Sequence, residues 1–209
     1  EFHRKVFREG PGRTLADAVV AVTGYEGKFV PVENEAVRVS IRQCTFGTRA
    51  VAMTFGQRLE VTNESDQAHT PHLVGGPMKA LLVAMPGGEP IRLYPTRVGR
   101  YGLTDTMHPV MFADVIVVKY PPHDVTGLDG AFEIGRIPVG EVTVTAFLPT
   151  TMQKVERKVT VRERQTTELD LEIAFDADNG AYLIASARGR AALLQSADGG
   201  RTFRAHAIP

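Results

Sequence analysis

The chain has 209 residues, enough for one large domain or two small ones, and its 43% hydrophobic and 23% charged residues are typical of a folded globular protein. Its 24 basic and 24 acidic residues cancel, so we do not expect the concentrated positive field that binds nucleic acid or an acidic membrane. A single cysteine, Cys44, excludes an intramolecular disulfide and any site built from several cysteines. No apolar stretch approaches the roughly 20 residues that span a bilayer. The chain begins without a methionine and is interpreted as a trimmed piece, so a missing signal peptide indicates no compartment.

Strand signals follow one another through the first 120 residues. Residues 36–42 alternate between apolar and polar side chains, the period of a half-buried strand. Glycine and proline separate most such segments, and no stretch of a dozen residues has a helical period. Residues 78–85 fit either a two-turn helix or a buried strand. We predict an all-β chain, with strands in this part at 18–22, 36–42, 49–55, 59–63 and 114–119.

A domain boundary is expected at Pro121 and Pro122, because proline cannot donate a hydrogen bond to a ladder. About 55 residues bury little surface alone, so the second domain should pack against the first. The predicted division is 1–120, 121–175 and a tail at 176–209. The tail is expected to hold a β-hairpin and one turn of the Asp-box type. Strand signals after the boundary lie at 128–134, 141–147, 158–162 and 167–173.

Histidine and methionine gather in two segments, 61–72 and 101–111, each of which lies between predicted strands. Loops at one end of a β-sandwich are close together, so these segments can converge. Imidazole binds both Cu(II) and Cu(I), and thioether sulfur favours Cu(I). The spacing of His108 and Met111 lets one turn present both side chains to one ion. The pattern therefore indicates a copper site.

Several stretches of the sequence resemble those of two known families. Residues 56–66 (GQRLEVTNESD) and 108–111 (HPVM) resemble motifs of the cupredoxins, of the methylamine-utilisation, plastocyanin-like type, and residues 16–20 fit an early strand. Residues 126–140 resemble a carboxypeptidase-regulatory-like (transthyretin-like) domain. The resemblance implies a Greek-key cupredoxin-like sandwich followed by a small β-sandwich module.

The resemblance also implies a ligand set. His69 falls at the position of the first copper histidine, with His72 as its rival, and His108 and Met111 match the later loop. The family's loop cysteine aligns with Asp105, whose carboxylate cannot supply the copper–thiolate bond of a blue site. We therefore expect a copper site at these five residues that is not blue. Cys44 is expected to be an inert core residue.

The leading functional hypothesis is a periplasmic or secreted copper-binding protein that acts in copper carriage or electron transfer. A redox or copper-transfer protein is its expected partner. We expect no enzyme activity, nucleic acid or small-molecule substrate, and a membrane only through peripheral association. One alternative is a scaffold with a vestigial metal site. The other is a zinc hydrolase with His69, His72 and His108 as ligands and Glu64 or Asp66 as general base.

Overall fold

The computed structural model of the chain describes residues 7–25, 35–76 and 81–174, and the backbone of three strands at 182–187, 190–195 and 204–207. Met78 and the predicted Asp-box turn at 196–203 lie outside these residues. Apart from one short 3-10 turn, Pro11–Arg13, the regular elements of the described part are all β-strands, which confirms the all-β prediction. Within the same residues, no helix is long and apolar enough to cross a bilayer.

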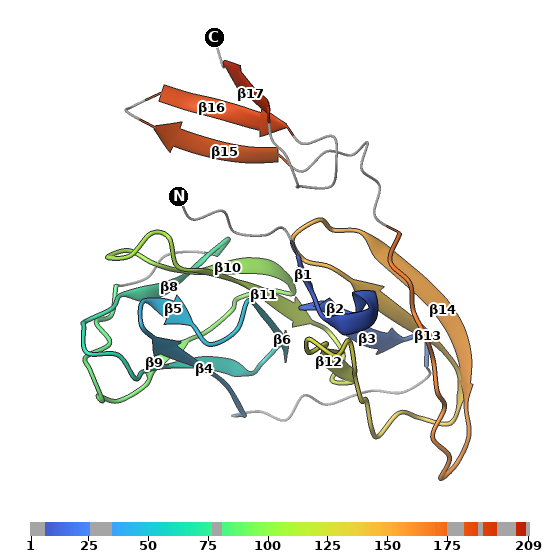
Figure 1. Cartoon of the computed structure of the whole chain (residues 1–209). Helices are drawn as coiled ribbons and strands as arrows, with labels where there is room; N and C mark the ends of the chain where they lie inside the picture. Colours follow the sequence, from blue (N-terminus) through green and yellow to red (C-terminus); the bar gives the residue numbers. More distant parts are fainter. Residues whose placement is uncertain are drawn as a thin grey trace.

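The central part of the chain forms a two-sheet sandwich (Figure 1). One sheet has the order β5 (Thr45–Phe46), β4 (Ala36–Arg42), β7 (Arg58–Asn63), β9 (Ile91–Leu93). The other has the order β6 (Ala50–Thr54), β11 (Phe112–Val118), β10 (Gly99–Asp105), β8 (Pro71–Val74). Each sheet contains one parallel pair, β4 with β7 and β6 with β11. The chain passes repeatedly from one sheet to the other, and the two sheets enclose one core. The predicted β-sandwich is therefore confirmed.

Alternating side chains build the core of this sandwich. In β4, Val39 and Ile41 are buried, whereas Arg38 and Arg42 point to solvent. The buried core combines residues of both sheets: Val39, Ile41, Phe46, Val51, Met53, Leu59, Val61, Tyr101, Leu103, Met111, Ala113, Val115 and Val117. The β8–β10 register places Asp105 opposite Pro71, so the end of β10 lies beside the segment that leads into β8.

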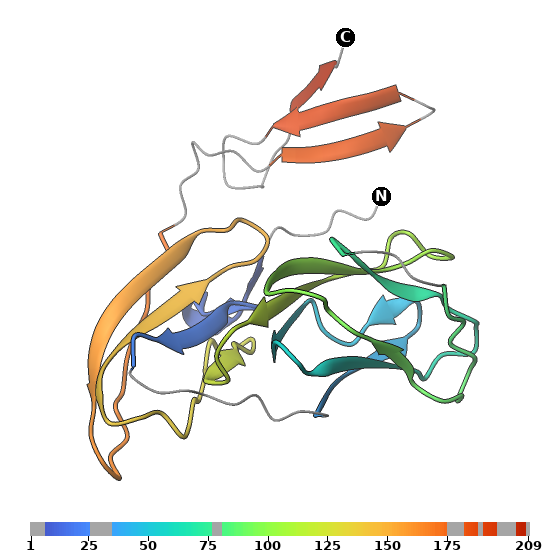
Figure 2. The same cartoon turned by 180° about the vertical axis from the view of Figure 1, so that it is seen from behind.

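A separate four-stranded sheet, which we call the module sheet, lies beside the sandwich in both views (Figures 1 and 2). Its order is β12 (His123–Val125), β3 (Val19–Thr23), β13 (Gly140–Phe147), β14 (Lys154–Val161). Its buried residues come from β3 and β13: Val20, Val22, Val142, Val144 and Ala146. Partly buried apolar residues outside its strands, among them Phe132, Leu169 and Leu171, pack against them. The further β-module that the sequence indicated is therefore present.

Two details of this module differ from the sequence interpretation. Residues 16–20 were expected in the sandwich, but β3 pairs with β12 and β13 instead. A division at residue 120 therefore leaves out β3, which comes before that residue but belongs to the module sheet. Residues 128–134 and 167–173 alternate as strands do, yet neither joins a ladder in the structure. Their apolar side chains cover the module core instead, and burial on one face is enough to produce the alternation.

Charged side chains line the junction between the two parts. Arg8 of β1 (Arg8–Glu9), which pairs with β2 (Leu15–Ala16), donates two hydrogen bonds to Asp17, at 2.7 and 2.6 Å. These bonds raise the pKa of Arg8. Arg49 lies in the field of both Asp17 and Asp114, and burial lowers its pKa. A cavity of about 10 Å³ adjoins Asp17, Arg49 and Asp114, and its lining combines charged and apolar residues from both parts.

The predicted hairpin of the tail is also present. Strand β15 (Tyr182–Ala187) pairs antiparallel with β16 (Arg190–Gln195), and β17 (Arg204–Ala207) adds a third strand.

Candidate metal centre

The segment between β7 and β8 holds His69 in the interior. Its backbone forms a two-way bridge with Ala84, with N···O distances of 3.1 and 2.7 Å. Asn63 fixes the preceding turn: its amide donates to the carbonyls of Gln67 (2.7 Å) and Ala84 (2.8 Å), and its Oδ1 accepts the N–H of Ser65 (3.0 Å). The His69 side chain is consequently 0% exposed.

Asp105 at the end of β10 ties the second segment to the first. Its Oδ2 accepts the N–H of Thr70 (2.7 Å), and its Oδ1 accepts the N–H of His108 (2.7 Å). A further backbone bond from Met111 N–H to the His108 carbonyl (2.9 Å) closes the turn before β11. A short acidic side chain at the start of a turn commonly caps backbone groups in this way. Asp105 is therefore the residue that holds the two segments together.

His69, Asp105 and His108 form one cluster. One nitrogen or oxygen atom from each lies within 4.8 Å of the other two. His69 Nδ1 is 3.4 Å from Asp105 Oδ2, and His108 Nδ1 is 3.1 Å from Oδ1. The imidazole rings are tilted by 41° with centroids 4.5 Å apart. Only the His108 side chain reaches solvent, with 23% exposed. The predicted convergence of the two segments is therefore present in the structure.

The protons of the cluster can be placed from its hydrogen bonds. His108 Nδ1 lies at hydrogen-bonding distance from a carboxylate, which only accepts, so Nδ1 carries the proton there. His69 differs: its Nε2 is 3.0 Å from Ser65 Oγ, and its buried Nδ1 has no hydrogen-bond partner. A buried polar atom without a partner is rare and costs about 1–3 kcal/mol. This buried nitrogen, 3.4 Å from Asp105 Oδ2, has the chemistry of a ligand atom for a metal ion.

The other predicted residues lie elsewhere. His72 was a rival to His69, but it lies on β8 opposite Thr104, and its Nδ1 is near the Thr70 carbonyl (3.3 Å) and Thr106 Oγ1 (3.2 Å). It is not part of the metal-competent cluster found in the described residues. Met111 is buried in the sandwich core, directly after the turn that carries His108, and its role as a ligand stays a prediction.

The candidates for other chemistry are also separate from the cluster. Cys44 is half-buried in the β4–β5 turn, with Sγ 3.9 Å from Gln67 Oε1. Glu64 and Asp66 are exposed, and Glu64 pairs with Arg42 at 2.6 Å. Neither acid belongs to the cluster of His69, Asp105 and His108.

The sequence interpretation missed Ser65 as a functional residue. Its hydroxyl contacts His69 Nε2 (3.0 Å) and Asn63 Oδ1 (2.7 Å). The signal was the run of short polar residues from Asn63 to Ser65, which is typical of turns that bond to their own backbone. Such a run predicts the turn but not the histidine that it contacts.

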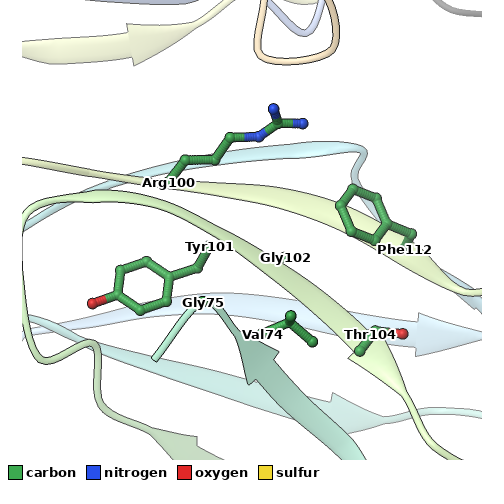
Figure 3. Close-up of a pocket in the computed structure, with 7 residues that line it drawn as sticks. All are labelled: Val74, Gly75, Arg100, Tyr101, Gly102, Thr104 and Phe112. Atoms are coloured by element: carbon green, nitrogen blue, oxygen red, sulfur yellow. The ribbon is translucent and has the colours of Figure 1, made fainter. Parts of the chain in front are cut away.

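None of the three cluster residues lines the cavity shown in Figure 3. This cavity has a volume of about 380 Å³ and lies along β8, β10 and β11 (Figure 3). Its lining residues are Val74, Gly75, Arg100, Tyr101, Gly102, Thr104 and Phe112. The Phe112 ring covers Gly102, where an added Cβ would be 2.6 Å from the ring. In the cluster, by contrast, His69 and Asp105 are buried and the His108 side chain is partly exposed.

Comparisons with known proteins give a structural likeness only. No protein-family model and no curated protein matches the sequence. A mutant of amicyanin is similar at 26% identity and a TM-score of 0.35, over 42% of this chain and 86% of that chain. The copper-containing nitrite reductase of Thermus scotoductus SA-01 (21%, TM-score 0.35) covers 42% of this chain and 23% of its own. The purple cupredoxin of Nitrosopumilus maritimus (12%, TM-score 0.34) covers 39% of this chain and 98% of its own. Likenesses at these TM-scores support no conclusion about ligands or activity.

Proposed function

We propose that this chain binds one transition-metal ion between His69, Asp105 and His108, and that copper is the ion it carries. The observation that carries the proposal is the orphaned Nδ1 of His69, fully buried and 3.4 Å from a carboxylate oxygen. A lone pair and a carboxylate repel each other unless a proton or a metal ion lies between them. A metal ion that binds the carboxylate and His69 Nδ1, and that displaces the proton of His108 Nδ1, removes that conflict.

The chemistry of the donors favours copper. Among divalent first-row ions, Cu(II) binds nitrogen and oxygen ligands most strongly. The thioether of Met111, which follows His108 in the turn, is the proposed additional ligand for Cu(I). Bound copper would supply a one-electron redox couple. Because Asp105 replaces a thiolate, the Cu(II) form should lack intense blue absorption and give a type-2-like paramagnetic spectrum.

A hydrolase is less well supported, although Ser65, His69 and Asp105 follow one another as in a serine triad. In such a triad the serine hydroxyl donates to the imidazole, and the imidazole Nδ1–H donates to the carboxylate. Here the Ser65 hydroxyl has a closer acceptor in Asn63 Oδ1 (2.7 Å), and the Nδ1–Oδ2 separation is 3.4 Å. The imidazole is also 0% exposed, which leaves an ester or amide no access to it.

The wider role that we propose is copper carriage or electron transfer, without catalysis, in the periplasm or outside the cell. Two of the three ligands are buried, and only the edge of His108 reaches solvent. Copper or an electron would therefore pass to a protein partner at the His108 side.

Calorimetric titration with Cu(II) tests the site. Wild-type protein should show one saturable copper per chain, with an affinity that His108→Ala lowers by about 100-fold or more. His72→Ala is the matched control, because His72 is a nearby histidine outside the cluster, and it should bind copper as the wild type does. Zn(II) should bind more weakly and be displaced by copper.

The scaffold hypothesis makes the opposite prediction. If wild-type protein gives no saturable heat, or if His72→Ala and His108→Ala lose binding equally, the metal proposal is wrong. The hydrogen bonds of Asp105 to Thr70 and His108 would then only join the two segments, and the metal site would be vestigial.

A further inference from the structure

We propose that Ser65 is a positioning residue that holds His69 in the tautomer with Nδ1 unprotonated, ready for a metal ion. This inference rests on the proposed metal site, but its central observation belongs to the metal-free protein. The bond between His69 Nε2 and Ser65 Oγ, 3.0 Å long, is the contact that transmits the effect.

The direction of that bond follows from Asn63. Its amide nitrogen faces two carbonyls, those of Gln67 and Ala84, so the amide orientation is set and Oδ1 must be the acceptor. Oδ1 receives the N–H of Ser65 at 3.0 Å and faces the hydroxyl oxygen of the same residue at 2.7 Å. The Ser65 hydroxyl proton is therefore directed at Asn63.

The second acceptor near the hydroxyl leads to the same result. Ser65 Oγ also lies 3.2 Å from the Gln67 carbonyl, which can only accept. Whichever acceptor takes the single hydroxyl proton, Oγ has lone pairs left for His69 and no proton to donate. Nε2 must then be the protonated nitrogen of His69, which leaves the lone pair on Nδ1.

This arrangement matters because the other tautomer would close the site. With a proton on Nδ1, His69 would have no lone pair on that atom, and the proposed ligand set would lose one of its two nitrogen donors. Ser65 opposes this state by offering Nε2–H its acceptor inside the protein. Groups that hold the far nitrogen of a ligating histidine typically change metal affinity by about 10–100-fold.

Nitrogen-15 NMR of the metal-free protein tests the tautomer without any metal. Wild-type His69 should show a protonated Nε2 and an unprotonated Nδ1. Ser65→Ala should shift His69 toward the Nδ1–H form, and Ser65→Thr, which keeps a hydroxyl, should restore the wild-type pattern. Thr106→Ala is the matched control, since it removes a hydroxyl that contacts His72 instead, and it should leave His69 unchanged.

Copper titration of the same variants completes the test. Ser65→Ala should bind copper about 10–100-fold more weakly than wild type, and Ser65→Thr should recover most of the loss. A wild-type His69 that is protonated on Nδ1, or an unchanged affinity in Ser65→Ala, overturns the inference. A wild-type protein that binds no copper but shows the predicted tautomer overturns the proposed function and leaves the positioning role of Ser65 standing.

Discussion

Two buried aspartates on the β10–β11 hairpin have opposite surroundings. Asp105 and Asp114 are each 1% exposed. Asp114 Oδ1 accepts hydrogen bonds from Arg100 Nε at 2.8 Å and Nη2 at 2.7 Å, so a permanent cation neutralises it. Asp105 accepts two backbone N–H groups and faces two imidazoles, and no lysine or arginine among the described residues pairs with it.

The difference separates a structural carboxylate from a functional one. Burying a charge without a partner costs several kcal/mol, so a protein normally supplies the opposite charge nearby. The sandwich does so at Asp114 with its own Arg100. At Asp105 it supplies hydrogen bonds from two backbone N–H groups and the neighbouring imidazoles. In the proposed function, a metal ion would neutralise Asp105 in the way that Arg100 neutralises Asp114.

Replacing each aspartate by asparagine should reveal the largest difference between them, which is a difference in Cu(II) affinity. Asp105→Asn removes the charged ligand and should weaken Cu(II) binding by about 100-fold or more. Loss of a residue that only orients a ligand typically weakens binding by about 10–100-fold, and loss of the ligand itself should cost at least as much. Asp114→Asn should leave the affinity within about twofold. Competition calorimetry measures both, and equal losses in the two variants would contradict the separate roles.

Unfolding by urea should show the converse. Asp114→Asn should lower the free energy of unfolding by about 2 kcal/mol, the size of hydrogen bonds to a charged group, whether or not copper is present. The reduction is moderated because Arg100 is 41% exposed and can be hydrated. Copper at about 100 times the wild-type Kd should stabilise wild type by about 2.7 kcal/mol and Asp105→Asn, whose Kd is about 100-fold higher, by about 0.4 kcal/mol or less.

Acid sensitivity should come from a half-buried group, His123 of β12. Burial is the main cause that lowers its pKa below the ordinary value of 6.5, against hydrogen bonds to the backbone of Tyr120, Ala52 and Pro121 and the charge of Asp124. The unfolded chain then binds a proton more readily than the folded one. Its contribution is fully present above pH 6.5 and is lost as the pH falls through the lower folded pKa.

The variant His123→Gln tests this effect. Urea unfolding measured between pH 7 and pH 5 should show a shallower loss of stability in the variant than in wild type. An identical pH dependence in both proteins would place the acid-sensitive group elsewhere.

The smallest effect is expected at an exposed ion pair. Lys158 Nζ and Glu141 Oε1 are 2.9 Å apart across β13 and β14, with side chains 72% and 64% exposed. Solvent screens such pairs, so Glu141→Gln should change the unfolding free energy by about 0.5 kcal/mol or less. A loss as large as that of Asp114→Asn would show that burial does not explain the difference between these carboxylates.

The strands of the sandwich could be predicted because apolar and polar residues alternate where one face of a strand is buried, as in β4. The partner of a strand could not, which is why the sheet of β3 was misplaced. The closeness of His69, Asp105 and His108 could be anticipated, because the two segments that carry them were expected to be loops at the same end of a sandwich. Choosing between His69 and His72 needed the β8–β10 register. The contact with Ser65 depends on a turn geometry that residue types alone do not specify.

Anomalous diffraction at the copper edge, from crystals grown with Cu(II), tests the central claim most directly. The account predicts one strong peak per chain, about 2.0–2.2 Å from the Nδ1 atoms of His69 and His108 and from a carboxylate oxygen of Asp105. A peak at His72 or Cys44 instead, or no peak at an occupancy above background, would contradict it.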